Sequence, residues 1–254
     1  AMMGPTLVFT IPVALGIIDK NDHKFLATGV LSGIITIPIG CLAGGLVAGF
    51  PIQMILMNLI PIVLVAAIIM LGLWFKPEAM IKGFTVFGKF VVIVAIIGLV
   101  VGAIQLLVGV TLIPGIEPIT SGIEVVGGIA LTLAGAFCFV FVITKVFKTP
   151  LMKLGKVLGM NEIAAAGLVA TLANSIPMFQ MMKDMDDRGK IINVAFAVSA
   201  AFVLGDHLGF TAGVAKEMIF PMMVGKLIGG VTAILVAVFM ANRMLGKKTT
   251  EGAK

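Results

Sequence analysis

The chain of 254 residues is 60% hydrophobic and only 12% charged, with a formal net charge of +6. A water-soluble domain carries about 25% charged residues, so this composition excludes an ordinary soluble domain and predicts that lipid covers much of the surface. The basic residues stand in short clusters between apolar runs, which argues against a nucleic-acid-binding protein.

The apolar runs predict membrane-spanning helices. A helix needs about 20 apolar residues to cross a bilayer, and the runs at 52–75 and 91–113 supply them without one charged residue. We expect spans at 1–18, 25–49, 52–75, 90–113, 125–144, 163–182, 191–220 and 222–241. Two lysine-containing stretches, 76–89 and 145–161, are expected to lie along the membrane surface. The predicted fold class is therefore an all-α membrane protein.

Segment 163–182 either crosses the bilayer or enters it and returns as a re-entrant hairpin. If it returns, sixteen of the 18 basic residues fall on one side, whereas a full crossing divides them. Because cytoplasmic loops are rich in Lys and Arg, the charges favour the hairpin. Asn174, Ser175 and Pro177 interrupt the run at its middle, and a backbone break at that depth must lie within protein or a wet cavity. We expect about seven transmembrane helices plus this hairpin.

An internal repeat relates the two ends of the chain. Shifting residues 1–18 by 201 positions onto 202–219 gives seven identities without a gap, and a shift of 196 aligns 29–36 with 225–232. With the hairpin in place, the two copies run in opposite directions, as in many inverted-repeat transporters. Chance similarity among glycine-rich helices is the alternative. Nothing before the first copy matches the hairpin that precedes the second, so we expect a first repeat truncated at its amino-terminal side.

These features predict a single transmembrane domain over residues 1–254. Its expected parts are a remnant of the first repeat (1–50), connecting spans (51–144), the second repeat (145–242) and a cytoplasmic tail (243–254). Glycine pairs four residues apart let helices approach closely. We expect such packing surfaces at Gly29/Gly33, Gly45/Gly49 and Gly225/Gly229.

Asp206 is the best-placed acid at span depth, and it stands in a predicted helix break between Gly205 and Gly209. An ionised carboxylate inside a bilayer is costly, so such a residue usually marks a substrate or ion pathway. The alternative is an Asp near one interface, or one paired with His207 to hold a helix break. His207 itself can titrate near neutral pH or can be purely structural.

Asn174 and Ser175 would stand at the tip of the hairpin. Their hydrogen-bonding groups either contact a polar solute or satisfy the backbone groups that Pro177 leaves unpaired. Both roles agree with the sequence.

Thr6 aligns with His207 in the repeat, and Pro5 aligns with Asp206. Because Pro5 removes a backbone donor, residues 2–6 are predicted to form the matching helix break. The sequence shows no nucleophile–base pair, phosphate-binding loop or metal-ligand cluster, so we expect no enzyme activity, cofactor or metal. The candidate substrate-binding set is Asp206, His207, Asn174, Ser175 and Thr6.

Four long strings carry a resemblance to a known family: ATLANSIPMFQMMKDMDDRGKIINVAFAVSAAFVLGDHLGF, MMGPTLVFTIPVALGI, GVLSGIITIPIGCLAGG and FPMMVGKLIGGVTAI. Over about residues 2–241 the chain resembles the ethanolamine permease (EutH) family of bacterial ethanolamine-utilisation operons, whose members are longer at the amino terminus. The resemblance implies a multi-pass carrier in the bacterial inner membrane with ethanolamine as its substrate, and the distribution of basic residues predicts a cytoplasmic carboxyl terminus. It implies no nucleic-acid partner and leaves a homo-oligomer open.

Ethanolamine also agrees with the residues. It is a small cation with a hydroxyl at neutral pH, so one carboxylate helped by amide or hydroxyl groups is a sufficient recognition set. Another small polar solute would satisfy the same description. A passive channel would need a continuous polar pore, and a non-transporting scaffold would leave the broken helices unexplained.

Overall fold

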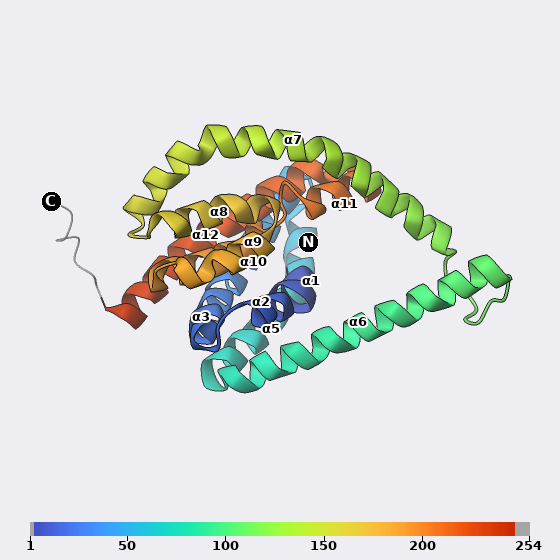
Figure 1. Ribbon diagram of the computed structural model, residues 1–254, viewed down its shortest axis with the longest axis horizontal. Helices are drawn as coiled ribbons and strands as arrows, with labels where there is room; N and C mark the ends of the chain where they lie inside the picture. The colour runs from blue at the N-terminus through green and yellow to red at the C-terminus, as the bar shows by residue number, and fades with distance from the viewer. Residues whose placement is uncertain (1–2, 247–254) are drawn as a thin grey trace.

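A computed structural model describes residues 3–246 of the chain, and this part is helical with no β-strand. Figure 1 shows most helices gathered in one bundle, with α6 and α7 reaching away from it and meeting at their far ends. The elements are α1 (Met3–Pro5), η1 (Thr6–Thr10), α2 (Ile11–Ile17), η2 (Lys20–Asp22), α3 (His23–Ile34), α4 (Ile37–Val47), α5 (Ile52–Phe75), α6 (Pro77–Val108), α7 (Ile119–Val157), α8 (Glu162–Ala173), α9 (Ser175–Met181), η3 (Met182–Asp184), α10 (Asp187–Ala200), α11 (Asp206–Val214), η4 (Lys216–Met218) and α12 (Ile219–Leu245).

Four stretches of the described chain are long and apolar enough to cross a membrane. They support a multi-pass membrane protein, because each carries about the 20 apolar residues that a bilayer requires. The predicted tail at 243–254 falls mostly on residues outside those described. The four stretches are Lys20–Val47, Ile52–Gly72, Glu78–Val108 and Lys216–Leu245.

The two predicted surface helices are not separate elements. Residues 76–89 form the first turns of α6, and most of 145–161 forms the last turns of α7. A helix stops where its backbone hydrogen bonding is interrupted, often at a glycine in the left-handed conformation. Gly109, with φ of +75°, ends α6, and Gly159, with φ of +70°, follows α7. No such stop separates the lysines of 77–89 from the apolar run that follows them in α6, or the lysines of 145–156 from the apolar run that precedes them in α7. Each helix therefore continues through both parts.

Helix α10 is the centre of the bundle, because every residue from Gly189 to Ala200 is buried. Helix α3 packs on it through two glycines. A Cβ atom at Gly29 would lie 2.5 Å from Cβ of Val194, and one at Gly33 would lie 2.5 Å from Cβ of Val198. The first predicted glycine pair is therefore a close helix–helix contact.

The other two glycine pairs have different outcomes. A Cβ atom at Gly225 of α12 would lie 2.7 Å from the carbonyl oxygen of Gly40 in α4, so these backbones touch. A Cβ atom at Gly229 would lie 3.0 Å from Oγ of Ser199 in α10, and one at Gly45 would lie 2.9 Å from the side chain of Ile55 in α5. Gly49 was wrongly expected to pack. Its φ is +78°, no atom lies within 4 Å of its Cβ position, and it follows the end of α4.

One end of the bundle, here called the polar end, joins turns that are far apart in the chain. Nζ of Lys190 lies 2.6 Å from Oδ1 of Asp22, and both side chains are almost wholly buried. The backbone N–H of Asn161, before α8, donates to Oδ1 of Asp186 at 2.8 Å. Arg188 donates to Oδ1 of Asn242 near the end of α12. Because residues 161 and 186 meet, α8 and α9 form a helical hairpin whose two ends lie together.

The close contact of α3 with α10 predicts that Gly33→Ala destabilises the protein. The new Cβ would also lie 2.7 Å from the carbonyl oxygen of Ala195, which cannot move without α10. Overpacking of this kind costs about 1–3 kcal/mol, and we expect a lower thermal unfolding midpoint in detergent. Gly98→Ala in α6 is the control, because nothing lies within 4 Å of its Cβ position. Equal midpoints for the two variants would contradict the packing.

Candidate functional site

The chain between α10 and α11 is unwound. Residues 201–205 connect the two helices through hydrogen-bonded turns, and Phe202 has a φ of +62°. A bulky residue with positive φ is an outlier that persists only where its surroundings hold it, most often at functional sites. The sequence predicted this break at 205–209, but Gly209 is helical and its N–H bonds to the carbonyl of Gly205. The break therefore lies just before the predicted position.

The last turn of α8 completes the hydrogen bonding of this unwound stretch. A helix leaves its last four carbonyls without partners inside the helix, and Pro177 has no N–H to offer to the carbonyl of Ala173. The N–H groups of Phe202 and Leu204 donate to the carbonyls of Thr171 and Leu172, at 3.1 and 2.9 Å. The tip of the hairpin is thereby joined to the break between α10 and α11.

Asn174 and Ser175 occupy the tip of the hairpin as the sequence predicted. Oδ1 of Asn174 accepts a hydrogen bond of 2.8 Å from the N–H of Ile176, so this side chain caps α9. Ser175 is fully buried, and its Oγ has no hydrogen-bond partner in the described chain. Oγ1 of Thr171, one turn earlier, is in the same situation. A buried polar atom without a partner is costly, which makes both hydroxyls candidates for a polar ligand.

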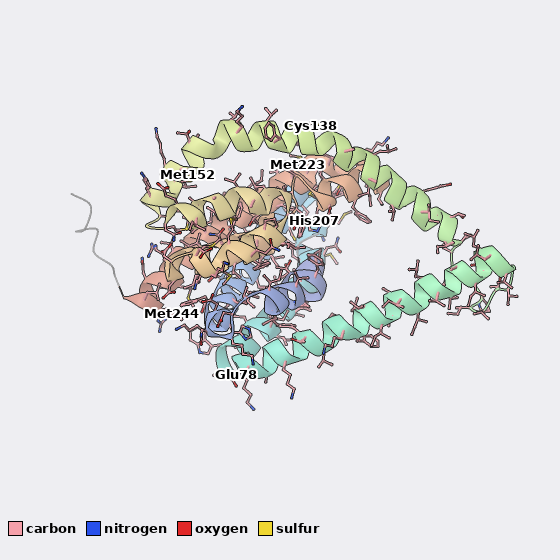
Figure 2. All side chains as sticks on the ribbon, in the orientation of Figure 1. Glu78, Cys138, Met152, His207, Met223 and Met244 are labelled. Atoms are coloured by element: carbon pink, nitrogen blue, oxygen red, sulfur yellow. The ribbon has the colours of Figure 1, made fainter. Side chains whose placement is uncertain are left out.

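Asp206 and His207 open α11 and line a pocket of about 410 Å³. The carboxylate of Asp206 is exposed there, at a helix N-terminus where negative charge is favoured. The ring of His207 packs on Phe202, with ring centroids 5.4 Å apart, and its buried Nδ1 has no partner in the described chain. Figure 2 shows His207 near the middle of the molecule. The other residues that line the pocket are Gly4, Pro5, Phe9 and Phe202.

Thr6 is buried, and its hydroxyl donates to the carbonyl oxygen of Val198 at 3.0 Å. This bond ties the amino-terminal helix to the end of α10. The predicted unwound break at 2–6 is wrong for the described residues, because Thr6–Thr10 form a π-helical turn. The N–H of Ile11 bonds to the carbonyl of Thr6, five residues back, and Pro12 has no N–H to continue the α-helical pattern. Such π-helical turns are frequent at functional sites.

Sequence reasoning missed Lys226. This lysine lies within the apolar span of α12, and only 1% of its surface is exposed. With Cys41 of α4 it lines a cavity of about 390 Å³. The signal was present in the sequence, because a lysine inside an apolar span is by default a functional residue. Unlike the other lysine clusters, it does not stand between apolar runs.

The junction of hairpin and break predicts a specific effect of Gly205→Ala. A Cβ atom at Gly205 would lie 2.1 Å from the carbonyl oxygen of Ala173, so the hairpin tip must move away. We expect faster hydrogen exchange at the amides of Phe202 and Leu204, measured by mass spectrometry. Gly213→Ala is the control, because the nearest atoms to its Cβ position are 4.0 Å away. Unchanged exchange in Gly205→Ala would show that the two backbone bonds do not hold the junction.

Comparison with known proteins gives a consistent result. The family model described as ethanolamine utilisation protein, EutH, matches residues 1–240. The chain is 81% identical to the "Probable ethanolamine permease EutH" of Listeria monocytogenes, over 97% of this chain and 66% of that protein. It is 56% identical to the "Probable ethanolamine permease EutH" of Escherichia coli, over 96% of this chain and 65% of that protein. It is 55% identical to the "Uncharacterized protein YxeR" of Bacillus subtilis, over 97% of this chain and 67% of that protein.

The chain thus spans about two thirds of the length of the curated relatives that it matches. No solved structure matches it. The match to the family model covers nearly the whole chain, including the hairpin, the break at 201–205 and α12. The chain belongs to the ethanolamine utilisation protein EutH family.

Proposed function

We propose that the protein takes up ethanolamine across the bacterial inner membrane, as a secondary carrier or facilitator. The observation that carries this proposal is the junction of the hairpin tip with the unwound residues 201–205, directly before Asp206. Discontinuous helices that meet inside a membrane domain are typical of transporter binding sites. The names of the relatives in Listeria and Escherichia, each a probable ethanolamine permease, support the substrate.

In this proposal, the carboxylate of Asp206 binds the ammonium group of ethanolamine. The substrate hydroxyl bonds to Nδ1 of His207, which is buried and has no partner within the described chain. A pocket of about 410 Å³ easily holds so small a molecule. Oγ of Ser175 and Oγ1 of Thr171 are further polar atoms at the adjoining hairpin tip. Asn174 has a capping role and Thr6 an anchoring role, so we assign both to holding the shape of the site.

The predicted inverted repeat is part of the same proposal. Gly4 and Pro5 align with Gly205 and Asp206 in the two copies, and Gly4, Pro5 and Asp206 line one pocket. Equivalent positions of two inverted copies are expected to meet near the axis that relates them. The shared pocket therefore supports a site at the interface of the two repeats.

We also propose that the polar end faces the cytoplasm and that α8 and α9 form a re-entrant hairpin. Two features support this sidedness. Asn161, Asp186, Arg188 and Asn242 are joined there by hydrogen bonds, so both ends of the hairpin lie on one side. The same end gathers basic residues, as cytoplasmic ends do. The carboxyl terminus would then be cytoplasmic.

Cysteine labelling tests this topology. In a background without Cys41 and Cys138, single cysteines at His23, Lys153 and Asp186 should be protected in intact cells from an impermeant thiol reagent. A cysteine at Glu117, in the loop after α6, should react. Lys82 lines one hollow with His23 and should be protected as well. Opposite labelling at positions 153 and 186 would show that α8 and α9 cross the membrane together.

The binding role predicts a large effect of Asp206→Asn in the product of the complete gene. This change keeps the shape of the side chain and removes its charge. Losing a charge-assisted hydrogen bond costs about 1.5–3 kcal/mol, so we expect at least roughly tenfold weaker ethanolamine binding by isothermal titration. The control is Glu217→Gln, in an exposed turn before α12, with an expected change of about twofold or less. Unchanged affinity in a folded Asp206→Asn protein would remove Asp206 from the site.

A further inference from the structure

A basic hollow of about 480 Å³ lies at the polar end, between the turn before α3 and the first turns of α6. Its basic lining residues are Lys20, His23, Lys24 and Lys82, and its acidic lining residue is Glu78. Figure 2 shows Glu78 at the start of α6. With His23 neutral, the three lysines outweigh the one glutamate, so the basic hollow favours an anion.

The lysines of the basic hollow keep their charges free for a ligand. Within the described chain, Lys20, Lys24 and Lys82 form no ion pair. Asp22 is committed to the buried ion pair of the polar end, and the side chain of Asp19 caps the turn η2. All three lysines are exposed, so an anion can reach them.

The basic hollow stands at the depth of the lipid head groups. The apolar stretch of α5 ends at Gly72, that of α6 begins at Glu78, and a third stretch begins at Lys20. Trp74 and Phe75, between the first two stretches, are exposed. Exposed tryptophan is typical of the interface between membrane and water. The ends of these stretches therefore place the hollow beside the phosphates of a bilayer.

An apolar hollow on α6 adjoins the basic one. It has a volume of about 640 Å³, and Lys82 lines both hollows. It is also lined by the exposed side chains of Val86, Phe87 and Phe90, and by Gly83, whose Cβ position has no atom within 4 Å. Lys82, Val86 and Phe90 are spaced by four residues, so they form one stripe about 12 Å long on the helix. This stripe leads from head-group depth into the apolar span.

Together the two hollows match an amphiphile. A free phosphate ion would use the basic hollow alone and would leave the apolar one uncovered. A phospholipid would fill both, because its phosphate and its acyl chain are joined as the two hollows are joined at Lys82. Basic pockets between membrane helices are known to bind anionic head groups.

We propose that the two hollows bind one anionic phospholipid, with its phosphate at Lys20, Lys24 and Lys82 and an acyl chain along Val86 and Phe90. This inference does not depend on which solute the protein transports. The lipid bridges the turn before α3 and the first turns of α6, where α6 leaves the bundle (Figure 1). It thereby ties the long α6 to the rest of the protein.

The test is lipid titration by native mass spectrometry, with the product of the complete gene in detergent. The probes are dioleoyl phosphatidylglycerol, which is anionic, and dioleoyl phosphatidylethanolamine, which is zwitterionic. Wild-type protein should retain the anionic lipid more strongly. Lys82→Gln should weaken this retention by about fivefold, which is the contribution of one lysine near a membrane surface. Glu78→Gln should strengthen it, because it removes the acid from the basic hollow.

Two further variants separate this site from general attraction. Lys153→Gln is the matched control, because it removes the same charge from an exposed lysine of α7 that lines neither hollow. Its lipid preference should equal that of wild type. Phe90→Ala should weaken retention of both lipids alike, since it removes part of the acyl seat. Equal retention of the two lipids by wild type, equal effects of Lys82→Gln and Lys153→Gln, or displacement of the lipid by an equal concentration of inorganic phosphate would overturn the inference.

Discussion

Two backbone hydrogen bonds, from Phe202 to Thr171 and from Leu204 to Leu172, join the two interrupted helices of this protein. In a bilayer no water is available for an unpaired N–H or carbonyl group, and each such group costs several kcal/mol. The unwound residues 201–205 supply donors where the last turn of α8 has free carbonyls. Each interruption is thus tolerable because the other lies beside it, and the hairpin must stay docked for the site to keep its shape.

Around this junction the protein gathers groups that a membrane interior does not favour. Asp206 and His207 come from α11, and the buried hydroxyls of Thr171 and Ser175 come from the hairpin. Buried polar groups of this kind are costly unless they are compensated, and the proposed substrate would supply hydrogen bonds to the groups of the pocket.

A close-packed frame holds the junction in place. Helix α3 approaches α10 at Gly29 and Gly33, and α12 approaches α4 at Gly225, in contacts that leave no room for a methyl group. At the polar end, the buried pair of Asp22 and Lys190 adds a bond that is expensive to break, because either charge left alone would lack a partner. The hairpin packs on the same central helix, because a Cβ atom at Gly167 of α8 would lie 2.5 Å from Oδ1 of Asn193 in α10.

The sequence by itself determined the protein class, because the uncharged runs at 52–75 and 91–113 are long enough to cross a bilayer and too apolar to be exposed to water. It also indicated Asp206 and the interruption at Asn174–Pro177, since an acid within an apolar run and a missing N–H are local properties of single residues. The tertiary structure decided where the second interruption lies, because residues 201–205 unwind only where the carbonyls of α8 can receive their N–H groups. It likewise decided the burial of Lys226, which depends on how α12 packs against α10 and α4. Such pairings depend on contacts between residues far apart in the chain, and local sequence patterns do not encode them.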